Sequence, residues 1–255
     1  DHVWGNQLFE DAEIIAHRTV PGRMKEAADP RALQKLLDDA SHLLPRLWLR
    51  ALHPGALAAA RQLQRDYEFD GITPVPPPTL FEDRLVLDLD GTEAHLIHVG
   101  PCHQAGDAIV HVPREGVVFA GDVIFRECTP LGWTGTYARW LQSLDLIIWL
   151  DPQVIVPGHG PVCGSEGAME TKAYLEHVRE EAMRCFEREL TSLQAAKRID
   201  LGPYEGWHGP ARLYVNVERA YREFRNEPAD APWDRTATFD AIYEVARARR
   251  CAVEF

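Results

Sequence analysis

The pattern of apolar positions divides the sequence into a helical stretch, a stretch of alternation and a second helical stretch. Residues 13–17 form a short apolar run that predicts a buried strand. Between residues 20 and 68, apolar residues recur at steps of three and four, which places them on one face of a helix. Pro30 and Pro54 stand where the first turn of a helix tolerates proline. The proline-rich run 73–79 then predicts an extended connector.

Alternating apolar and polar residues replace the helical period between residues 80 and 125, which predicts strands. Alternation over 85–89 leads into the turn signal Asp90-Gly91, so this stretch begins a hairpin. The segments 108–112 and 117–120 flank a second turn. The stretch therefore predicts two hairpins.

The rest of the pattern is helical again, with one interruption. Residues 137–148 carry an amphipathic pattern that Pro152 ends, and 154–156 predict a short strand. The sequence after about residue 165 is helical in pattern. Hairpins followed by helix, strand and helix predict a mixed α/β layered core with a helical C-terminal tail.

Composition and charge narrow the class of protein. The chain has 255 residues, of which 45% are hydrophobic and 26% charged, as is typical of a soluble globular protein with a sizeable core. Asp and Glu number 39 against 27 Lys and Arg. The net charge of −12 argues against a nucleic acid or an anionic membrane as the main partner. The sequence has no apolar run of about 18 residues that would predict a membrane span.

The cysteines bear on location. All 5 are scattered without a CxxC pair, a usage typical of reduced thiols in a cytosolic protein. The sequence therefore predicts a cytoplasmic location, although it begins without methionine and so leaves a signal peptide open.

Four short segments carry side chains that bind metal ions. They contain Asp1 and His2, His103, Asp122, and His159. Any one of them alone is weak evidence, because a lone histidine is more often a surface or core residue. Imidazole and carboxylate together suit Zn²⁺, Fe²⁺ or Mn²⁺, and glycines beside Asp122 and His159 allow the backbone to pass close to a metal ion. The combination predicts a preorganised metal site.

In this order and spacing, the segments resemble the motifs of the metallo-β-lactamase superfamily. Those motifs are H-x-H-x-D-H, a histidine before Gly-Asp, Gly-Asp after a buried strand, and Pro-Gly-His, and the resemblance runs from residue 1 to about 163. It implies a four-layer αββα sandwich that lacks its first strands. Residues 1–165 would form the catalytic core, with a helical insertion at about 20–68, and 166–255 a helical extension packed on the core.

The resemblance also implies a role for each candidate residue. His103 would bind a first metal ion, Asp1, His2 and His159 a second, and Asp122 would bridge both. Asp1 would also orient a catalytic hydroxide. Aspartate at the bridging position is similar to glyoxalase II and lactonases. The implied cofactors are two Zn²⁺ ions, with iron or manganese as alternatives.

The function implied is a binuclear metal-dependent hydrolase. It would use a metal-bridging hydroxide on an ester, thioester, lactone or amide bond of a small-molecule substrate. Two alternatives stay open: a mononuclear iron dioxygenase of the same fold, similar to persulfide dioxygenases, and a non-catalytic binding protein with an impaired metal site. A homo-oligomer also stays open.

Two further histidines and several strands precede the Asp-His pair in the family. We therefore expect the residues directly before Asp1 to read His-x-His-x in a working enzyme, and an apolar sheet face near residues 80–125. The second metal site should be the better formed, since His103 and Asp122 alone leave the first short of ligands.

Further expectations concern the surroundings of the site. The segment 20–68 should cover the site or form a subunit contact, since connections in compact domains are usually short. Trp133 and Tyr137 are candidates for the mouth of the site or for the core, and Asp107 for a turn former or a residue that supports His103. The remaining histidines are predicted not to be ligands.

Overall fold

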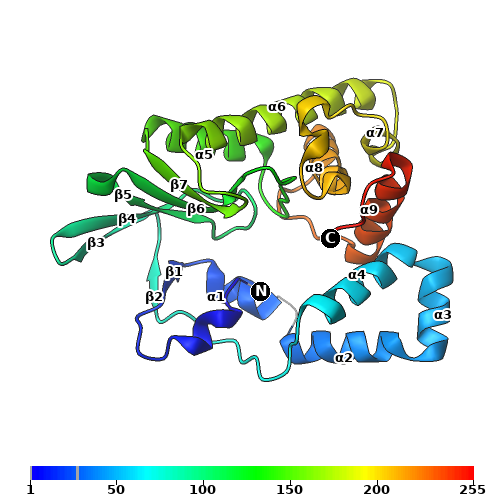
Figure 1. Ribbon diagram of the computed structural model, residues 1–255, viewed down its shortest axis with the longest axis horizontal. Coiled ribbons are helices and arrows are strands. Elements are labelled where there is room, and N and C mark those ends of the chain that lie inside the picture. Colours follow the sequence, from blue (N-terminus) through cyan, green and yellow to red (C-terminus); the bar gives the residue numbers. More distant parts are fainter. Residues whose placement is uncertain (1, 27–28) are drawn as a thin grey trace.

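The computed structural model describes residues 2–26 and 29–255, and a five-stranded sheet lies at one side of it, at the left in Figure 1. The strand order follows the sequence, and pairing is antiparallel except between the last two strands. Asp90 and Gly91 have φ angles of 53° and 89°, as a two-residue hairpin turn requires, and both predicted hairpins are present. The strands are β3 (Arg84–Leu89), β4 (Thr92–His98), β5 (Ala108–Val112), β6 (Val117–Phe125) and β7 (Val154–His159).

Two helices cover one face of this sheet (Figure 1). Ile109, Val118 and Ile155 are fully buried on that face, within the main hydrophobic core. Trp140 donates its indole N–H to the carbonyl of Val123 over 2.9 Å, which ties a covering helix to strand β6. The two helices are α5 (Tyr137–Trp149) and α6 (Ser165–Glu187). They support β6 and β7, the strands that carry two of the candidate metal ligands.

The opposite face of the sheet is also apolar. Leu85, Leu96, Val110, Phe119 and Val156 are register partners in one row across all five strands, so their side chains point to the same side. Phe119 is 48% exposed, whereas the residue before it points to the helices and is buried. The apolar face expected near residues 80–125 is therefore present, and within residues 2–26 and 29–255 it is only partly covered.

The predicted helical stretch is helical in the structure, and Pro30 and Pro54 each begin a helix. Strands β1 (Ile15–His17) and β2 (Thr79–Phe81) pair in parallel at its two ends. Residues 69–78 form no helix or strand, in agreement with the predicted connector. The helices are α1 (Val20–Glu26), α2 (Pro30–Ser41), α3 (Leu43–Leu52) and α4 (Pro54–Asp66), after the 3₁₀ helix η1 (Trp4–Leu8).

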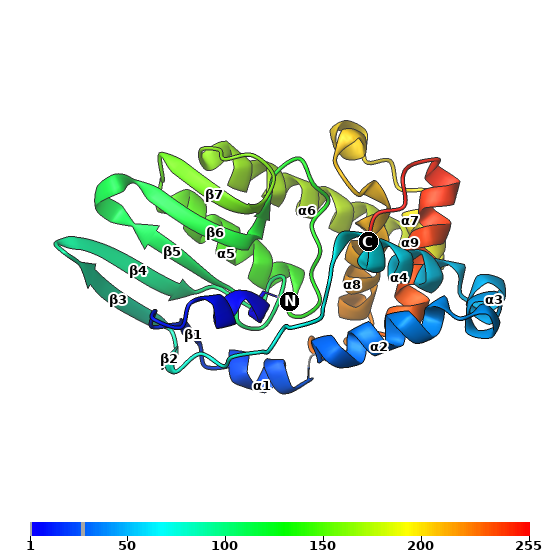
Figure 2. The ribbon, with the colours of Figure 1, turned by 60° about the horizontal axis from the view of Figure 1, so that its bottom comes forward.

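The C-terminal part is helical, as predicted, and it meets the insertion (Figures 1 and 2). α4 packs against α9, and Asp240 on α9 accepts hydrogen bonds from the N–H groups of Gly55 and Ala56, over 2.8 and 3.2 Å. None of the described helices is both long and apolar enough to cross a membrane. The remaining elements are α7 (Ser192–Ala196), α8 (Leu213–Phe224), α9 (Arg235–Arg249), and the 3₁₀ helices η2 (Pro113–Glu115), η3 (Gly202–Gly206) and η4 (Pro210–Arg212).

Gly55 should be essential for the contact between α4 and α9. A Cβ atom at this position would lie 2.2 Å from the backbone oxygen of Phe239 and 2.5 Å from Cα of Asp240. We expect Gly55→Ala to destabilise the protein by about 1–3 kcal/mol, as overpacking does, and to raise protease cleavage between residues 20 and 68. Gly22→Ala is the control, because nothing lies within 4 Å of its Cβ. Equal melting temperatures for the two variants would contradict this.

Acid should weaken the contact between β1 and β4, where His17 stacks on His98 with ring centroids 3.6 Å apart. Burial lowers the pKa of His17 below 6.5, and the charges of His98 and Arg18 lower it further. Below pH 6.5 the unfolded chain therefore takes up a proton that the folded chain resists, so stability falls as the pH falls. Denaturant unfolding of wild type and His17→Gln between about pH 8 and pH 5 measures this. The variant should show the flatter dependence, and identical slopes would contradict the assignment.

Candidate metal centre

Three histidines surround the carboxylate of Asp122 on β6. The Nε2 atoms of His2 and His103 lie 3.5 and 3.4 Å from its Oδ2, and Nε2 of His159 lies 3.5 Å from its Oδ1. Potential ligand atoms of His2, His103 and Asp122 all lie within 4.8 Å of one another. The structure thus brings together four of the five predicted metal ligands. Asp1, the fifth and the predicted catalytic residue, lies outside the described residues.

The two carboxylate oxygens of Asp122 face different histidines. This arrangement suits a bridging ligand, because each oxygen can bind a separate cation. His2 lies beside His103, with ring centroids 5.2 Å apart, and which of two metal ions it would bind stays a prediction. Among the described residues, the tightest group of potential ligands is therefore His2, His103 and Asp122. This grouping gives no support to the expectation that the second metal site, the one of His159, is the better formed.

The loop between β4 and β5 fixes His103. The carboxylate of Asp107 accepts hydrogen bonds from the backbone N–H groups of Cys102, His103 and Gln104, over 3.0, 2.7 and 3.0 Å. Asp107 therefore forms the turn, as predicted. The ring Nδ1 of His103 lies 2.8 Å from the carbonyl oxygen of Leu131. Because a carbonyl only accepts, Nδ1 carries the proton and the Nε2 lone pair is directed towards Asp122.

The protonation states suit metal binding. Burial lowers the pKa of His103, which favours the neutral imidazole that a metal ligand requires. Burial opposes ionisation of Asp122, but the hydrogen bond from His159 and the interaction with the neighbouring histidines outweigh it, and the pKa of Asp122 is lowered. The donor set of a charged carboxylate and three imidazoles therefore fits a divalent metal ion.

A close approach between β6 and β7 requires glycine beside His159. A Cβ atom on Gly158 would lie 1.9 Å from Oδ1 of Asp122 and 2.7 Å from its backbone nitrogen. His159 itself stacks on Phe125 of β6, with ring centroids 4.9 Å apart and planes 8° from parallel. The sequence motif Pro-Gly-His thus places an imidazole next to the carboxylate because its glycine leaves room for both.

Comparison with known proteins identifies the family. A family profile described as "Metallo-beta-lactamase superfamily" matches residues 1–159, which include all five predicted ligands. The chain belongs to this superfamily. The α/β metallo-β-lactamase fold predicted from the motifs is confirmed.

Among the relatives of this superfamily member is a 2,4-dinitroanisole O-demethylase subunit alpha from Nocardioides sp. (strain JS1661). It is 30% identical over 82 residues, which are 30% of this chain and 24% of the relative. A metallo-beta-lactamase type 2 from Bacteroides fragilis is 28% identical over 123 residues, 46% of this chain and 49% of the relative. The chain thus spans a quarter to a half of the length of these curated relatives.

A solved structure shares the fold of this superfamily member. The crystal structure of a metallo-beta-lactamase family protein from Thermus thermophilus superposes with a TM-score of 0.51 at 19% sequence identity. The match covers 84% of this chain and 67% of that one, so the likeness extends well beyond residues 1–159. At this identity it shows the fold alone.

The metal centre of this superfamily member opens into a cavity of about 770 Å³. Val20, Arg23, Met24 and Lys25 of α1 form one wall, which supports the prediction that the segment 20–68 covers the site. Contact of this segment with another subunit stays a prediction. The walls also include, from the core, His2, His103, Asp122 and Trp133, and from the C-terminal part, residues 230–233 and Arg235.

The two aromatic candidates for the mouth of the site separate in the structure. Trp133 lines the cavity. Tyr137 is 1% exposed and donates its hydroxyl hydrogen to the carbonyl of Asn216 over 3.0 Å, so it belongs to the core. Trp233 and Arg235 were missed by sequence reasoning. No motif marks them, and only the fold brings them to the cavity.

Proposed function

We propose that the protein is a binuclear metal-dependent hydrolase acting on an ester, thioester, lactone or amide bond of a small molecule. The observation that carries this proposal is the carboxylate of Asp122, whose Oδ2 faces His2 and His103 and whose Oδ1 faces His159. A carboxylate with imidazoles at both oxygens is suited to hold two cations close together. Asp1 is proposed to complete the set and to orient the nucleophile.

The residues around the candidate metal centre each have a role in this proposal. When bound, two divalent ions supply a nucleophile from water at neutral pH and polarise the scissile group. Asp107 and the Leu131 carbonyl keep His103 in one orientation and one tautomer, so that the site is preorganised. The walls from α1, from residues 230–233 and from Arg235 would enclose the substrate. The proposed metal is zinc, with iron or manganese as alternatives, and the proposed location is cytoplasmic.

The name of one relative adds a bond type to the proposal. The Nocardioides protein is named as a subunit of an O-demethylase for 2,4-dinitroanisole, which is an aryl methyl ether. Its similarity covers 30% of this chain, so removal of a methyl group from an aryl oxygen is a candidate reaction beside ester hydrolysis.

Elemental analysis and a substrate screen test the proposal. We expect protein purified without added metal to contain close to two zinc ions per chain, and to hydrolyse at least one of an ester, thioester, lactone and amide panel. An aryl methyl ether belongs in the same panel. One iron per chain with oxygen uptake would instead support the dioxygenase. Substoichiometric metal without any hydrolysis would support a binding protein.

A further inference from the structure

A pair of tryptophans and an arginine form one edge of the cavity that holds the metal centre. We call Trp133, Trp233 and Arg235 the tryptophan–arginine rim. All three residues line the cavity. The guanidinium carbon of Arg235 lies 3.6 Å from the centre of the Trp133 ring, within the range of a cation–π contact. The rim joins the core, which supplies Trp133, to the C-terminal part.

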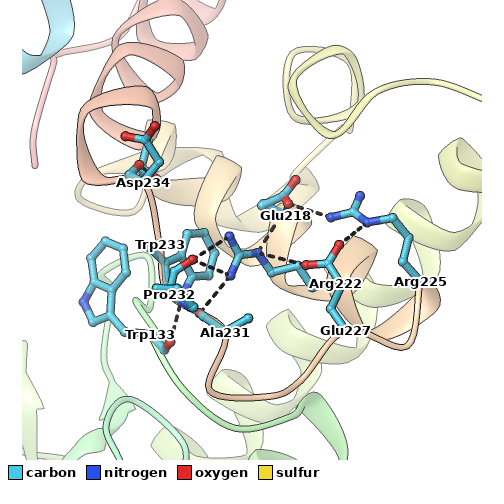
Figure 3. A network of polar contacts seen from close by, with 10 residues as sticks. Trp133, Glu218, Arg222, Arg225, Glu227, Ala231, Pro232, Trp233 and Asp234 are labelled. Atoms are coloured by element: carbon cyan, nitrogen blue, oxygen red, sulfur yellow. Dashed lines mark hydrogen bonds and ion pairs between the residues drawn. The ribbon is translucent and has the colours of Figure 1, made fainter.

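The rim is fixed by contacts that do not involve the metal centre (Figure 3). Trp233 donates its indole N–H to the carbonyl of Trp133 over 2.8 Å, and the two rings meet edge to face at 90°. Arg222 of α8 lies 4.1 Å from the Trp233 ring centre and donates to the carbonyl of Ala231 over 3.1 Å. Glu218 in turn pairs with Arg222 over 3.4 Å. The rim is therefore preorganised.

Arg235 differs from its arginine neighbours in having no carboxylate partner within the described residues. Arg222 and Arg225 both pair with Glu218 and with Glu227. For Arg235 the structure shows only the stacking on Trp133. Desolvation by the neighbouring side chains lowers the pKa of Arg235, with no opposing effect of a nearby acid. Stacking occupies the flat face of a guanidinium and leaves its N–H edges free for an anion.

The charge of the cavity is consistent with an anionic ligand. The protein carries a net charge of −12, yet Arg23 and Lys25 line the same cavity as Arg235. Of the acidic residues there, Asp107 is occupied by three backbone N–H groups and Asp122 by the histidines. Asp29 and Asp230 also line the cavity, so its walls carry both positive and negative side chains. The preference for an anionic ligand therefore rests on Arg235, which has no carboxylate partner among the described residues.

We propose that Arg235 binds a carboxylate group of the substrate, so that the substrate class is a carboxylate-bearing ester, thioester, lactone or amide. The guanidinium fork matches the two oxygens of a carboxylate, and Trp133 holds it in place. The bond to be cleaved lies at the metal centre while the carboxylate lies at the rim. This inference rests on the proposed hydrolase function.

Two substrates that share the same leaving group but differ in charge test the inference on the metal-loaded protein. We compare para-nitrophenyl acetate, which is neutral, with the mono-para-nitrophenyl ester of glutarate. Arg235→Gln should raise KM for the glutarate ester roughly 10- to 100-fold, the worth of a charge-assisted hydrogen bond, and leave KM for the acetate and both kcat values nearly unchanged. Arg235→Lys should restore only part of the loss, because lysine lacks the fork. Arg247→Gln, an exposed position on the same helix and outside the cavity, is the matched control.

A binding measurement separates failure of this inference from failure of the hydrolase proposal. Glutarate monoamide, which carries one carboxylate, and the neutral glutaramide are titrated calorimetrically into the unaltered protein, Arg235→Gln and Arg247→Gln. We expect the preference for the monoamide over the glutaramide to be lost only in Arg235→Gln. This result would support carboxylate binding by Arg235 even if no ester is cleaved. Equal affinities in all three proteins, or equal KM changes for both esters, would overturn the inference.

Discussion

Replacing Asp122 with alanine should reduce hydrolysis at least roughly 100-fold and leave the fold intact. Its carboxylate is the one group that contacts all three described histidines of the centre. Removing it takes away the negative charge that would hold two cations together. The strand around it does not depend on the carboxylate, because Val123 and Phe125 are anchored in the core.

The measurements are activity, metal content by elemental analysis, and circular dichroism. Asp230→Ala is the control, since Asp230 also lines the cavity but is not among the residues that surround the histidines. We expect the control to keep its metal and most of its activity. An Asp122→Ala protein with full metal content and full activity would show that the bridging assignment is wrong.

The elements were predictable from sequence where the deciding interactions are local. The Asp90-Gly91 turn takes positive φ angles that its residue types tolerate, and alternation defined the strands on either side. Pro30 and Pro54 begin helices because the proline ring fixes φ near the helical value and the first turn does not need the missing N–H. β6 runs on to Phe125, past the predicted end at 120, because β7 continues to pair with it through two irregularities in register.

The candidate ligands could be found in the sequence because they lie in short motifs. That they bind metal ions, and how they divide between two ions, stays a prediction. The resemblance groups His2 with His159, and in the structure His2 also lies close to His103. Which oxygen of Asp122 a histidine faces depends on how the chain crosses the cavity, and no spacing along the sequence encodes that.

The least predictable features join segments far apart in the sequence. The contact between α4 and α9 depends on Asp240 reaching the N-terminus of α4, and the rim depends on Trp233 reaching Trp133. Each depends on polar contacts between residues that no motif marks. The division into a core at 1–165 and an extension at 166–255 packed on it remains a prediction. The structure adds that the insertion and the C-terminal part share an interface and one cavity.

Gly158→Ala should weaken metal binding roughly 10- to 100-fold, the loss typical when a residue that orients a ligand is changed, without removing any ligand. The new Cβ would lie 1.9 Å from Oδ1 of Asp122, on the side that faces His159. The carboxylate must then rotate or shift away from that histidine. The backbone nitrogen of Asp122 would be only 2.7 Å away, so β6 has little freedom to absorb the clash by itself.

The readout is the rise in melting temperature when zinc is added to each metal-free protein, because a ligand that binds only the folded state stabilises it more the more tightly it binds. Referring each protein to its own metal-free form separates lost affinity from any general loss of stability. Gly206→Ala is the matched control, since nothing lies within 4 Å of its Cβ. We expect the control to show the full zinc-induced rise and Gly158→Ala only a fraction of it. The same rise in both variants would mean that Oδ1 of Asp122 and His159 do not share a metal ion.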